Sequence, residues 1–330
     1  MSEHLLEVKN LRTNFATGGG IVQAVRGVSL YVDAGEFIGI IGESGCGKSV
    51  SMMSVMQLLA DNAAVRADAI LFDGMDLQKQ SRKQMRKLLG SSIGMIFQDP
   101  MTSLNPLYTI GNQLMEPLRQ HQKMSRAAAK ERALEMLRLV GINEPEKRLK
   151  QYPHELSGGM RQRVMIAIAM CCTPKLLIAD EPTTALDVTI QAQIMELMAE
   201  LKDKFSTATI LITHDLGVIA SVCSRVMVMY GGKIMEEGSV EDIFYAPGHP
   251  YTEGLLRSVP GDGSGSREKL IPIPGSPPDL MNPPVGCPFA ARCPKAMQIC
   301  SMAPAELTEL APKHRAACWL HHPQVKSMQN

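Results

Sequence analysis

A glycine-rich stretch near the start of the chain carries the residue types that bind phosphate. It reads Gly42-Glu43-Ser44-Gly45-Cys46-Gly47-Lys48-Ser49, after the apolar run Phe37–Ile41 and before Val50–Met56, which can continue as a helix. Glycines let the backbone curl until several N–H groups point at phosphate oxygens, and the following helix adds its positive N-terminal end. Lys48 adds a full charge, and the Ser49 hydroxyl can bind Mg²⁺. A chance match in a glycine-rich turn is the alternative, but the strand before and the helix after favour a phosphate-binding loop.

Two adjacent carboxylates follow a second apolar run. Leu176–Ala179 has the length of a buried strand, and Asp180 and Glu181 come directly after it. Charged side chains are rarely buried without a role. In phosphoryl-transfer enzymes, one acid of such a pair holds Mg²⁺ and its neighbour can polarise the attacking water. A strand that ends in an ordinary charged turn is the alternative, and the phosphate-binding loop upstream favours the catalytic interpretation.

A second glycine-containing turn could also hold an anion. The residues Leu156-Ser157-Gly158-Gly159-Met160-Arg161-Gln162 lead into the helical stretch Arg163–Met170. Ser157 is a natural N-cap, and the two glycines allow close backbone approach. A turn of this kind at a helix N-terminus is an anion site, although a simple helix cap explains the same residues.

Two further side chains are candidates because of their positions. His214 follows the apolar run Thr209–Thr213. A lone histidine at a strand end is usually structural, but ligands bind at the carboxyl edge of a parallel sheet. Phe15 is one of few aromatic residues ahead of the phosphate loop. It could stack on a nucleotide base or be an ordinary edge-strand aromatic.

The elements that must position these residues follow from hydrophobic periodicity and turn residues. The sequence predicts an antiparallel pair of strands about a turn at Gly18–Gly20, and a hairpin about Gly231-Gly232. The predicted strands are residues 5–11, 28–32, 69–72, 93–97, 176–179, 209–213, 226–229 and 233–236, and the predicted helices are 81–89, 127–140, 163–170 and 188–204. We therefore expect an α/β core with a helical insertion at residues 110–150.

Composition restricts the possible functions. The 330 residues carry a formal net charge of +1 and are 4% aromatic, so neither a basic surface nor a base-stacking surface for nucleic acid is indicated. The longest apolar run, near Val164–Cys172, is too short to span a bilayer, and the N-terminus lacks the pattern of a signal peptide. We therefore expect a cytoplasmic protein, in which disulfide bonds are disfavoured.

The last part of the chain differs in composition. Residues 258–286 are rich in Pro, Gly and Ser, as expected of a linker or an extended wrapping segment. Half of the 8 cysteines follow, spaced C-x5-C-x6-C-x17-C, at Cys287, Cys293, Cys300 and Cys318. Zinc sites usually show a C-x2-C pair, whereas thiolates at wider spacing with Cys-Pro steps suit an iron–sulfur cluster. From the residues alone, three interpretations of these cysteines are about equally favoured: an iron–sulfur cluster, a zinc site and unligated cysteines.

Taken together, these stretches resemble the nucleotide-binding subunits of ABC transporters over roughly residues 5–257. The family's hallmarks occur in the family's order. They are the Walker A loop at Gly42–Ser49, the Q-loop residue Gln98, the ABC signature at Leu156–Gln162, the Walker B acids Asp180 and Glu181, the D-loop Asp187 and the switch histidine His214. One such match would be weak, but six in this order are specific.

Three stretches narrow the resemblance to the ATPase subunits of bacterial oligopeptide and dipeptide importers. They are residues 97–106, His249-Pro250-Tyr251-Thr252 and the proline-rich tail with its cysteines. The resemblance implies an α/β fold, a P-loop ABC-type nucleotide-binding domain with a RecA-like core, an antiparallel β subdomain and a helical subdomain. It places this domain at residues 1–257, with the helical subdomain at about 100–165. Residues 258–330 are then a Pro-rich linker and a four-Cys C-terminal extension.

The same resemblance implies ATP and Mg²⁺ as cofactors and a [4Fe–4S] cluster in the tail. The catalytic residues are then Glu181, His214, Lys48 and Gln98. The nucleotide-binding residues are then Phe15, Gly42, Ser44, Gly45, Cys46, Gly47, Lys48, Ser49, Val50, Gln98, Ser157, Gly158, Gly159, Gln162, Asp187 and His214. The expected ligands of Mg²⁺ are Ser49, Gln98 and Asp180, and those of the cluster are Cys287, Cys293, Cys300 and Cys318.

The resemblance also implies an assembly at the cytoplasmic face of the inner membrane. Its members are a second ABC ATPase subunit, identical or paralogous, two transmembrane permease subunits and a periplasmic or extracellular peptide-binding protein, with no nucleic acid. ATP would lie between the phosphate loop of one ATPase subunit and the signature turn of the other. The alternatives are the ATPase of another importer (for nickel or another small solute), an exporter or regulator-type ATPase, or a soluble ABC ATPase in nucleic-acid or translation processes.

Overall fold

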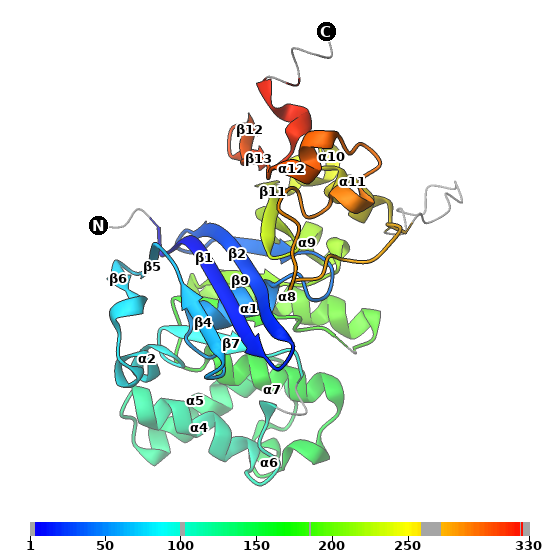
Figure 1. The fold of residues 1–330 in the computed structure, drawn as a ribbon. Helices are drawn as coiled ribbons and strands as arrows, with labels where there is room; N and C mark the ends of the chain where they lie inside the picture. The colour runs from blue at the N-terminus through cyan, green and yellow to red at the C-terminus, as the bar shows by residue number, and fades with distance from the viewer. Residues whose placement is uncertain (1–3, 100–102, 185, 259–271, 324, 326–330) are drawn as a thin grey trace, which may run out of the picture.

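The computed structural model describes residues 4–99, 103–184, 186–258, 272–323 and 325, and its strands form two sheets (Figure 1). The smaller sheet is antiparallel. β1 (Leu6–Thr17) pairs with β2 (Gly20–Val32), β4 (Ala63–Arg66) and β5 (Ala69–Phe72), and β6 (Met75–Asp76) pairs with β5. The turn between β1 and β2 lies at the predicted glycines, which confirms the predicted pair, although both strands are longer than expected.

The larger sheet is mixed, with the order β12-β13-β11-β10-β3-β9-β8-β7 in the described part of the chain. β10, β3, β9, β8 and β7 are parallel neighbours, so their carboxyl ends meet at one edge. The bounds are β3 (Phe37–Ile41), β7 (Ile93–Ile96), β8 (Leu176–Asp180), β9 (Ala208–Ile212), β10 (Arg225–Tyr230), β11 (Lys233–Ser239), β12 (Thr308–Ala311) and β13 (His314–Ala316). Ligands of parallel sheets bind at such an edge.

Helices flank the sheets and also form a region of their own. The bounds are α1 (Lys48–Val55), α2 (Arg82–Leu88), α4 (Ile110–His121), α5 (Arg126–Leu139), α6 (Pro145–Arg148), α7 (Gly158–Met170), α8 (Val188–Phe205), α9 (Leu216–Val222), α10 (Val240–Tyr245), α11 (Pro250–Arg257) and α12 (Gln298–Met302), with short 3₁₀ helices at Leu77–Lys79, Pro153–Glu155, Ala290–Arg292 and Trp319–His321. α4, α5 and α6 gather at the bottom of Figure 1 and are the predicted helical insertion.

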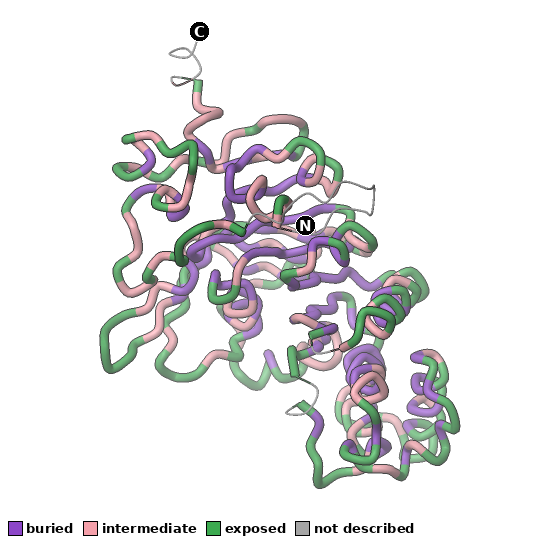
Figure 2. Tube along the Cα trace, turned by 90° about the vertical axis from the view of Figure 1, so that its right-hand side faces the viewer, coloured by how far each residue is buried: buried purple, intermediate pink, exposed green. Residues whose placement is uncertain are grey.

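Two hydrophobic cores lie on the two faces of the larger sheet because successive side chains of a strand point to opposite faces. In β3, Ile38 and Ile40 pack into the core shared with the antiparallel sheet and α1. Phe37 and Ile41 of the same strand pack into the core shared with the helices, which continues into the helical insertion. All five residues of β3 are buried, and Figure 2 shows buried stretches through the middle of the molecule and within its helical region. This continuous apolar strand holds the phosphate loop at its end.

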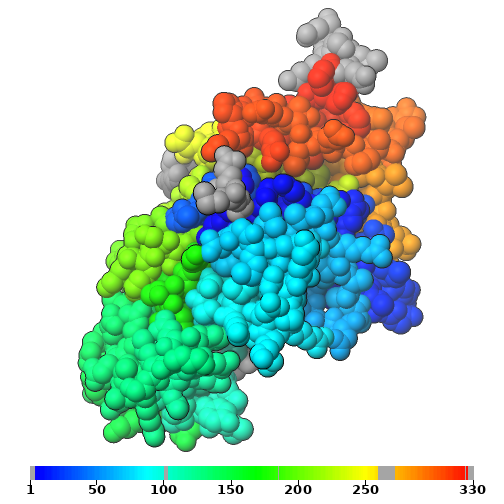
Figure 3. All heavy atoms as spheres, turned by 90° about the vertical axis from the view of Figure 1, so that its left-hand side faces the viewer, coloured from blue at the N-terminus to red at the C-terminus, as the bar shows by residue number. Residues whose placement is uncertain are grey.

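The cysteine-containing tail lies at the opposite end of the molecule from the helical insertion (Figures 1 and 3). Its β13 pairs antiparallel with β11, and β12 pairs with β13, so the tail extends the larger sheet. The sequence analysis did not predict these two short strands. Residues 259–271 of the predicted linker, Pro100–Thr102 of the predicted helical subdomain and Ala185 lie outside the described residues.

A buried carboxylate joins the tail to the core. Glu236 of β11 is 0% exposed and accepts hydrogen bonds from the backbone N–H of Gly248 (2.5 Å) and His249 (2.9 Å) and from the Nε2 of His314 in β13 (2.8 Å). A buried charge is tolerated when it is bonded in this way. One side chain therefore ties β11, the start of α11 and the tail together.

We expect Glu236→Ala to loosen the tail, because three buried donors lose their acceptor at once. Breaking a buried polar pair of this kind costs about 3 kcal/mol or more of the free energy of unfolding. Thermal unfolding and limited proteolysis of the purified chain measure it, with a lower Tm and faster cleavage after residue 258 expected. Glu309→Ala, at an exposed position of β12, is the control and should change neither. An unchanged Tm in Glu236→Ala would contradict this role.

Candidate functional site

The phosphate loop lies between the end of β3 and the start of α1 and depends on its glycines. Gly42 has φ +149° and Gly47 has φ +102°. A Cβ on Gly42 would lie 2.1 Å from the carbonyl oxygen of Met229, and one on Gly47 would lie 2.5 Å from that of Ala24. These positions therefore require glycine for space as well as for backbone angle. No side chain caps the first turn of α1, so its N–H groups are available to an anion.

The phosphate-loop lysine is held in place by backbone oxygens. Lys48 is 5% exposed, and its Nζ donates to the carbonyl oxygens of Gly42 (2.7 Å) and Glu43 (3.1 Å). Cys46 lies beside it, and burial raises the pKa of this thiol, so it behaves as a small apolar side chain. Ser44 and Gly45 are exposed at the tip of the loop, and Val50 is half-buried on α1.

Ser49, at the start of α1, contacts Asp180, at the end of β8. The Ser49 Oγ donates to Asp180 Oδ1 over 2.8 Å, and Asp180 is 6% exposed. Burial raises the pKa of Asp180, while the Ser49 hydroxyl and the Lys48 ammonium act against that rise. A hydroxyl and a carboxylate side by side at the phosphate loop are the oxygen ligands that Mg²⁺ takes. Ser49 and Asp180 therefore fit the predicted magnesium site, whereas Gln98, its third predicted ligand, donates to Glu181 instead.

Glu181 is the meeting point of three further polar side chains. Its Oε2 accepts from the Gln98 Nε2 (2.9 Å) and the Thr184 hydroxyl (2.9 Å), and its Oε1 lies 3.5 Å from the His214 Nδ1. Glu181 has φ +46°, an uncommon angle for a residue with a side chain. Gln98, Glu181 and His214 follow the neighbouring strands β7, β8 and β9, and this shared edge brings them together. The sequence analysis missed Thr184, although its spacing of three from Glu181 was the available signal.

The signature turn exposes Ser157 and, in the described residues, is not bonded to the phosphate loop of its own chain. Ser157 caps α7 by accepting from the N–H of Met160 (3.3 Å), and its side chain is exposed. A Cβ on Gly159 would lie 3.1 Å from Ile190 Cγ2 of α8, while Gly158 has more space. In the described residues, no hydrogen bond or ion pair joins this turn to residues 42–49. An anion bound at this turn would therefore not be one held by the phosphate loop of the same chain.

Three other predicted nucleotide-site residues have different surroundings. Gln162 is 1% exposed within α7, and its Nε2 has no partner among the described residues. Asp187 is exposed and caps α8 by accepting from the N–H of Ile190 (2.9 Å). Phe15 is half-buried in β1 and lies opposite both Val22 of β2 and Ala63 of β4. Phe15 therefore does not lie on a free edge.

The four tail cysteines line one small cavity with His249 and Trp319. Burial raises the pKa of Cys287 to about 11 and that of Cys318 to about 12, and burial also raises the pKa of Cys293. Backbone N–H groups of Phe289, Lys295 and Leu320 act against these rises. In the described residues, no group of three or more His, Cys, Asp or Glu side chains is placed to hold a metal ion. The structure therefore does not confirm the predicted cluster.

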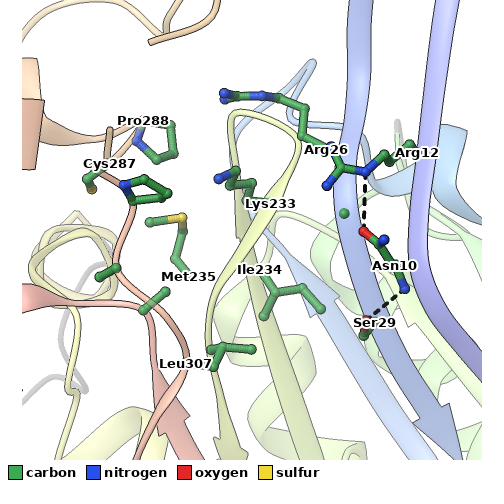
Figure 4. Close-up of a pocket in the computed structure, with 14 residues that line it drawn as sticks. Asn10, Arg12, Arg26, Ser29, Lys233, Ile234, Met235, Cys287, Pro288 and Leu307 are labelled. Carbon is green, nitrogen blue, oxygen red and sulfur yellow. Dashed lines mark hydrogen bonds between the residues drawn. The ribbon is translucent and has the colours of Figure 1, made fainter. Parts of the chain in front are cut away.

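A separate cavity of about 270 Å³ lies where β1, β2 and β11 meet the tail (Figure 4). It is lined by Arg12, Arg26 and Lys233, and burial lowers the pKa of Arg26 and of Lys233. Arg26 NH2 donates to the carbonyl oxygen of Pro284 over 2.9 Å, which ties the tail to β2. None of the residues lining this cavity belongs to the phosphate loop, so it is distinct from the phosphate site.

No helix among the described residues has both the length and the apolar character to cross a membrane.

Comparisons with known proteins agree with this geometry. Residues 25–184 match the family described as ABC transporter, and residues 235–300 match the one described as oligopeptide/dipeptide transporter, C-terminal region. The chain is 57% identical over 320 residues to the dipeptide transport ATP-binding protein DppD of Bacillus subtilis. This alignment covers 96% of this chain and 95% of the relative. It is 53% identical over 319 residues to the oligopeptide transport ATP-binding protein OppD of Escherichia coli, with 96% and 94% covered.

Solved structures share the fold. A dimeric ATP-binding cassette, MJ0796, bound to ADP and Pi, has a TM-score of 0.64 and 28% identity and covers 71% of this chain and 98% of its own. The protein cbiO1 of Clostridium perfringens has a TM-score of 0.62 and 28% identity and covers 74% and 92%. The chain therefore belongs to the ABC transporter family of ATP-binding proteins and carries the C-terminal region described for its oligopeptide and dipeptide transporters.

Proposed function

We propose that this chain is the ATP-hydrolysing subunit that powers import of oligopeptides or dipeptides through separate membrane subunits. The observation that carries the proposal is that Ser49 contacts Asp180, and Glu181 contacts Gln98 and His214, at the carboxyl ends of the parallel strands of the larger sheet. The relatives named dipeptide and oligopeptide transport ATP-binding proteins, at 57% and 53% identity, support the choice of peptides. In this proposal residues 1–257 are the ATP-binding domain, and residues 258–330 are the extension.

The roles of the site residues follow from their positions. Lys48 and the N–H groups of the phosphate loop bind the ATP phosphates, with Gly42, Ser44, Gly45, Cys46, Gly47 and Val50 shaping the loop. Mg²⁺ would be held by Ser49, Asp180 and Gln98 and would neutralise phosphate charge. Glu181 accepts a proton from the attacking water, and His214 helps to position that water. Phe15 stacks on the base.

A second ATPase subunit completes each site in this proposal. Ser157 is exposed at the N-terminus of α7, with Gly158 and Gly159 beside it, and such a turn binds an anion that arrives from outside the chain. The γ-phosphate of ATP held by the partner is that anion, and Asp187 and Gln162 support the turn. The MJ0796 structures are described as dimeric, one of them with ADP and Pi.

The membrane subunits bind beside the helical insertion in this proposal. A groove of about 500 Å³ there is lined by residues of β7, α4 and α7 and the loops between them, including Phe97, Leu104 and Tyr108. Phe97 is 42% exposed and Tyr108 is 54% exposed, so apolar area faces outward next to Gln98. A groove next to Gln98 can couple the ATP site to a permease. The chain would then act as a peripheral subunit at the cytoplasmic face of the inner membrane, with a peptide-binding protein on the other side.

We also propose that the four tail cysteines hold a [4Fe–4S] cluster. The support is that all four line one cavity and that the Met297 N–H donates to the Cys300 sulfur over 3.5 Å. N–H donors of this kind favour thiolate ligands. The cluster would link four separate parts of the tail, so its role would be structural.

Glu181→Gln tests the importer function. We expect the variant to bind ATP, to trap the closed pair of ATPase subunits and to lose turnover by a hundredfold or more, because it lacks the base that activates water. The two readouts are steady-state ATP turnover by the chain assembled with its partner subunits and uptake of labelled di- and tripeptides in a strain that lacks the gene. The unsubstituted gene should restore uptake, and the Glu181→Gln gene should not.

Glu200→Gln, on the exposed face of α8, is the control for this test and should behave as the parent. Unchanged turnover in Glu181→Gln would remove Glu181 from catalysis. If the unsubstituted protein shows normal ATP turnover but its gene does not restore peptide uptake, the chain is an ATPase and peptide import is refuted.

Iron and zinc analysis of anaerobically purified protein tests the cluster. We expect about four iron atoms per chain and visible charge-transfer absorbance, both lost in Cys287→Ser and in Cys318→Ser. Cys223→Ser, outside the tail, should keep both signals. A colourless protein that contains zinc, or one without metal, would refute the cluster.

A further inference from the structure

An arginine of the tail binds a residue of the phosphate loop. Arg292 NH1 donates to Glu43 Oε2 over 2.7 Å, and NH2 donates to Glu43 Oε1 over 3.0 Å. The two residues are 249 positions apart in the chain. Arg292 directly precedes Cys293, and Glu43 directly follows the first glycine of the loop. A two-point arginine–carboxylate pair is strong and directional.

The pair is shielded from water and fully bonded. The Arg292 side chain is 7% exposed and that of Glu43 is 25% exposed. The remaining donors of Arg292 bind the carbonyl oxygens of Pro274 (2.8 Å) and Ile273 (3.1 Å) and the hydroxyl of Tyr230 (3.0 Å). The bond to Glu43 raises the pKa of Arg292. The guanidinium therefore has one fixed orientation.

The backbone of Glu43 is fixed as well. Its N–H donates to the hydroxyl of Tyr251 over 2.9 Å. Its carbonyl oxygen accepts from the Lys48 Nζ (3.1 Å) and from the Cys46 N–H (3.3 Å). Lys48 is the side chain that carries charge to the ATP phosphates. The side chain of Glu43 therefore belongs to the tail contact, and its backbone belongs to the nucleotide site.

An aromatic cluster also holds in place the tail segment that carries Arg292. The ring of Tyr251 lies 4.5 Å from that of Tyr230 and 5.2 Å from that of Phe289, measured between centroids. Phe289 lies between Cys287 and Cys293 and is 1% exposed. Ring pairs at these distances pack well. The segment that carries Arg292 is therefore held against the end of β10 and the start of α11.

We propose that Arg292 is a positioning residue for ATP binding, because it holds the Glu43 carboxylate and so fixes the carbonyl oxygen that orients Lys48. The proposal rests on the proposed ATPase function and adds a contribution of the tail to the nucleotide site of its own chain. In the described residues, no hydrogen bond or ion pair joins Glu43 or Arg292 to Glu181, Gln98 or His214. Loss of the pair should therefore weaken ATP binding more than the chemical step.

The test measures ATP turnover over a range of MgATP concentrations by the chain assembled with its ATPase partner and permease subunits. Binding of a fluorescent ATP analogue is measured on the purified full-length chain. For Arg292→Met, which keeps length but loses charge, we expect KM to rise about tenfold and kcat to stay within about twofold. Arg292→Lys keeps the charge without the two-point geometry and should restore part of the affinity. Glu43→Gln should reproduce the effect of Arg292→Met, and the double variant should be no worse than either single variant.

Lys295→Met is the matched control. Lys295 lies two positions after Cys293 and pairs with Glu253 over 2.7 Å, away from the phosphate loop. This variant should leave KM unchanged. Limited proteolysis and thermal unfolding of each variant show whether the tail stays folded.

Two results would overturn the proposal. The first is an unchanged KM in a folded Arg292→Met protein. The second is a raised KM in Arg292→Met with a normal KM in Glu43→Gln, since the effect would then come from the tail's own folding. An unsubstituted assembly of this chain with its ATPase partner and permease subunits that shows no ATP turnover would instead refute the proposed function, so the two failures are distinguishable.

Discussion

The structure depends on one constraint: parallel strands end at a common edge. β3, β9, β8 and β7 are neighbours in the larger sheet, and each delivers one part of the site at its carboxyl end. β3 ends in the phosphate loop, β8 in Asp180 and Glu181, β9 in the segment with His214, and β7 in the segment with Gln98. Residues that are 83 positions apart, such as Gln98 and Glu181, therefore come within hydrogen-bonding distance. Much of the remaining architecture holds this edge in place: two cores bury both faces of the sheet, and the antiparallel sheet covers one of them.

Much of this edge could be predicted from the sequence because its signals are local. The loop around Gly42 and Lys48 shows its function in eight consecutive residues, and the apolar run before Asp180 marks a strand end. The predicted strands at residues 69–72, 93–97 and 209–213 agree with β5, β7 and β9 to within a residue or so. The position of His214 after an apolar run made it a candidate, and the family resemblance then named Gln98 and assigned a role to each of the two residues.

The parts that could not be predicted depend on distant pairs. Nothing around Arg292 indicates that it binds Glu43, and nothing around His314 indicates that it binds Glu236. β12 and β13 are too short, and too poor in apolar alternation, to be recognised as strands before their partner β11 is known. The burial of Gln162 is likewise a property of how α7 packs. In each case the information lies in the tertiary structure, and a single sequence does not contain it in readable form.

The pairing of β13 with β11 has a further consequence for the solution behaviour of the chain. A strand at the edge of a sheet offers unpaired backbone groups to any other chain that can add a strand. β13 covers the β11 edge with two residue pairs, at Glu236 and Glu237, and the Arg315 side chain adds an ion pair to Glu237. The tail thus shields an edge of the main sheet from self-association, and a chain cut before β13 would expose β11 as a template for aggregation.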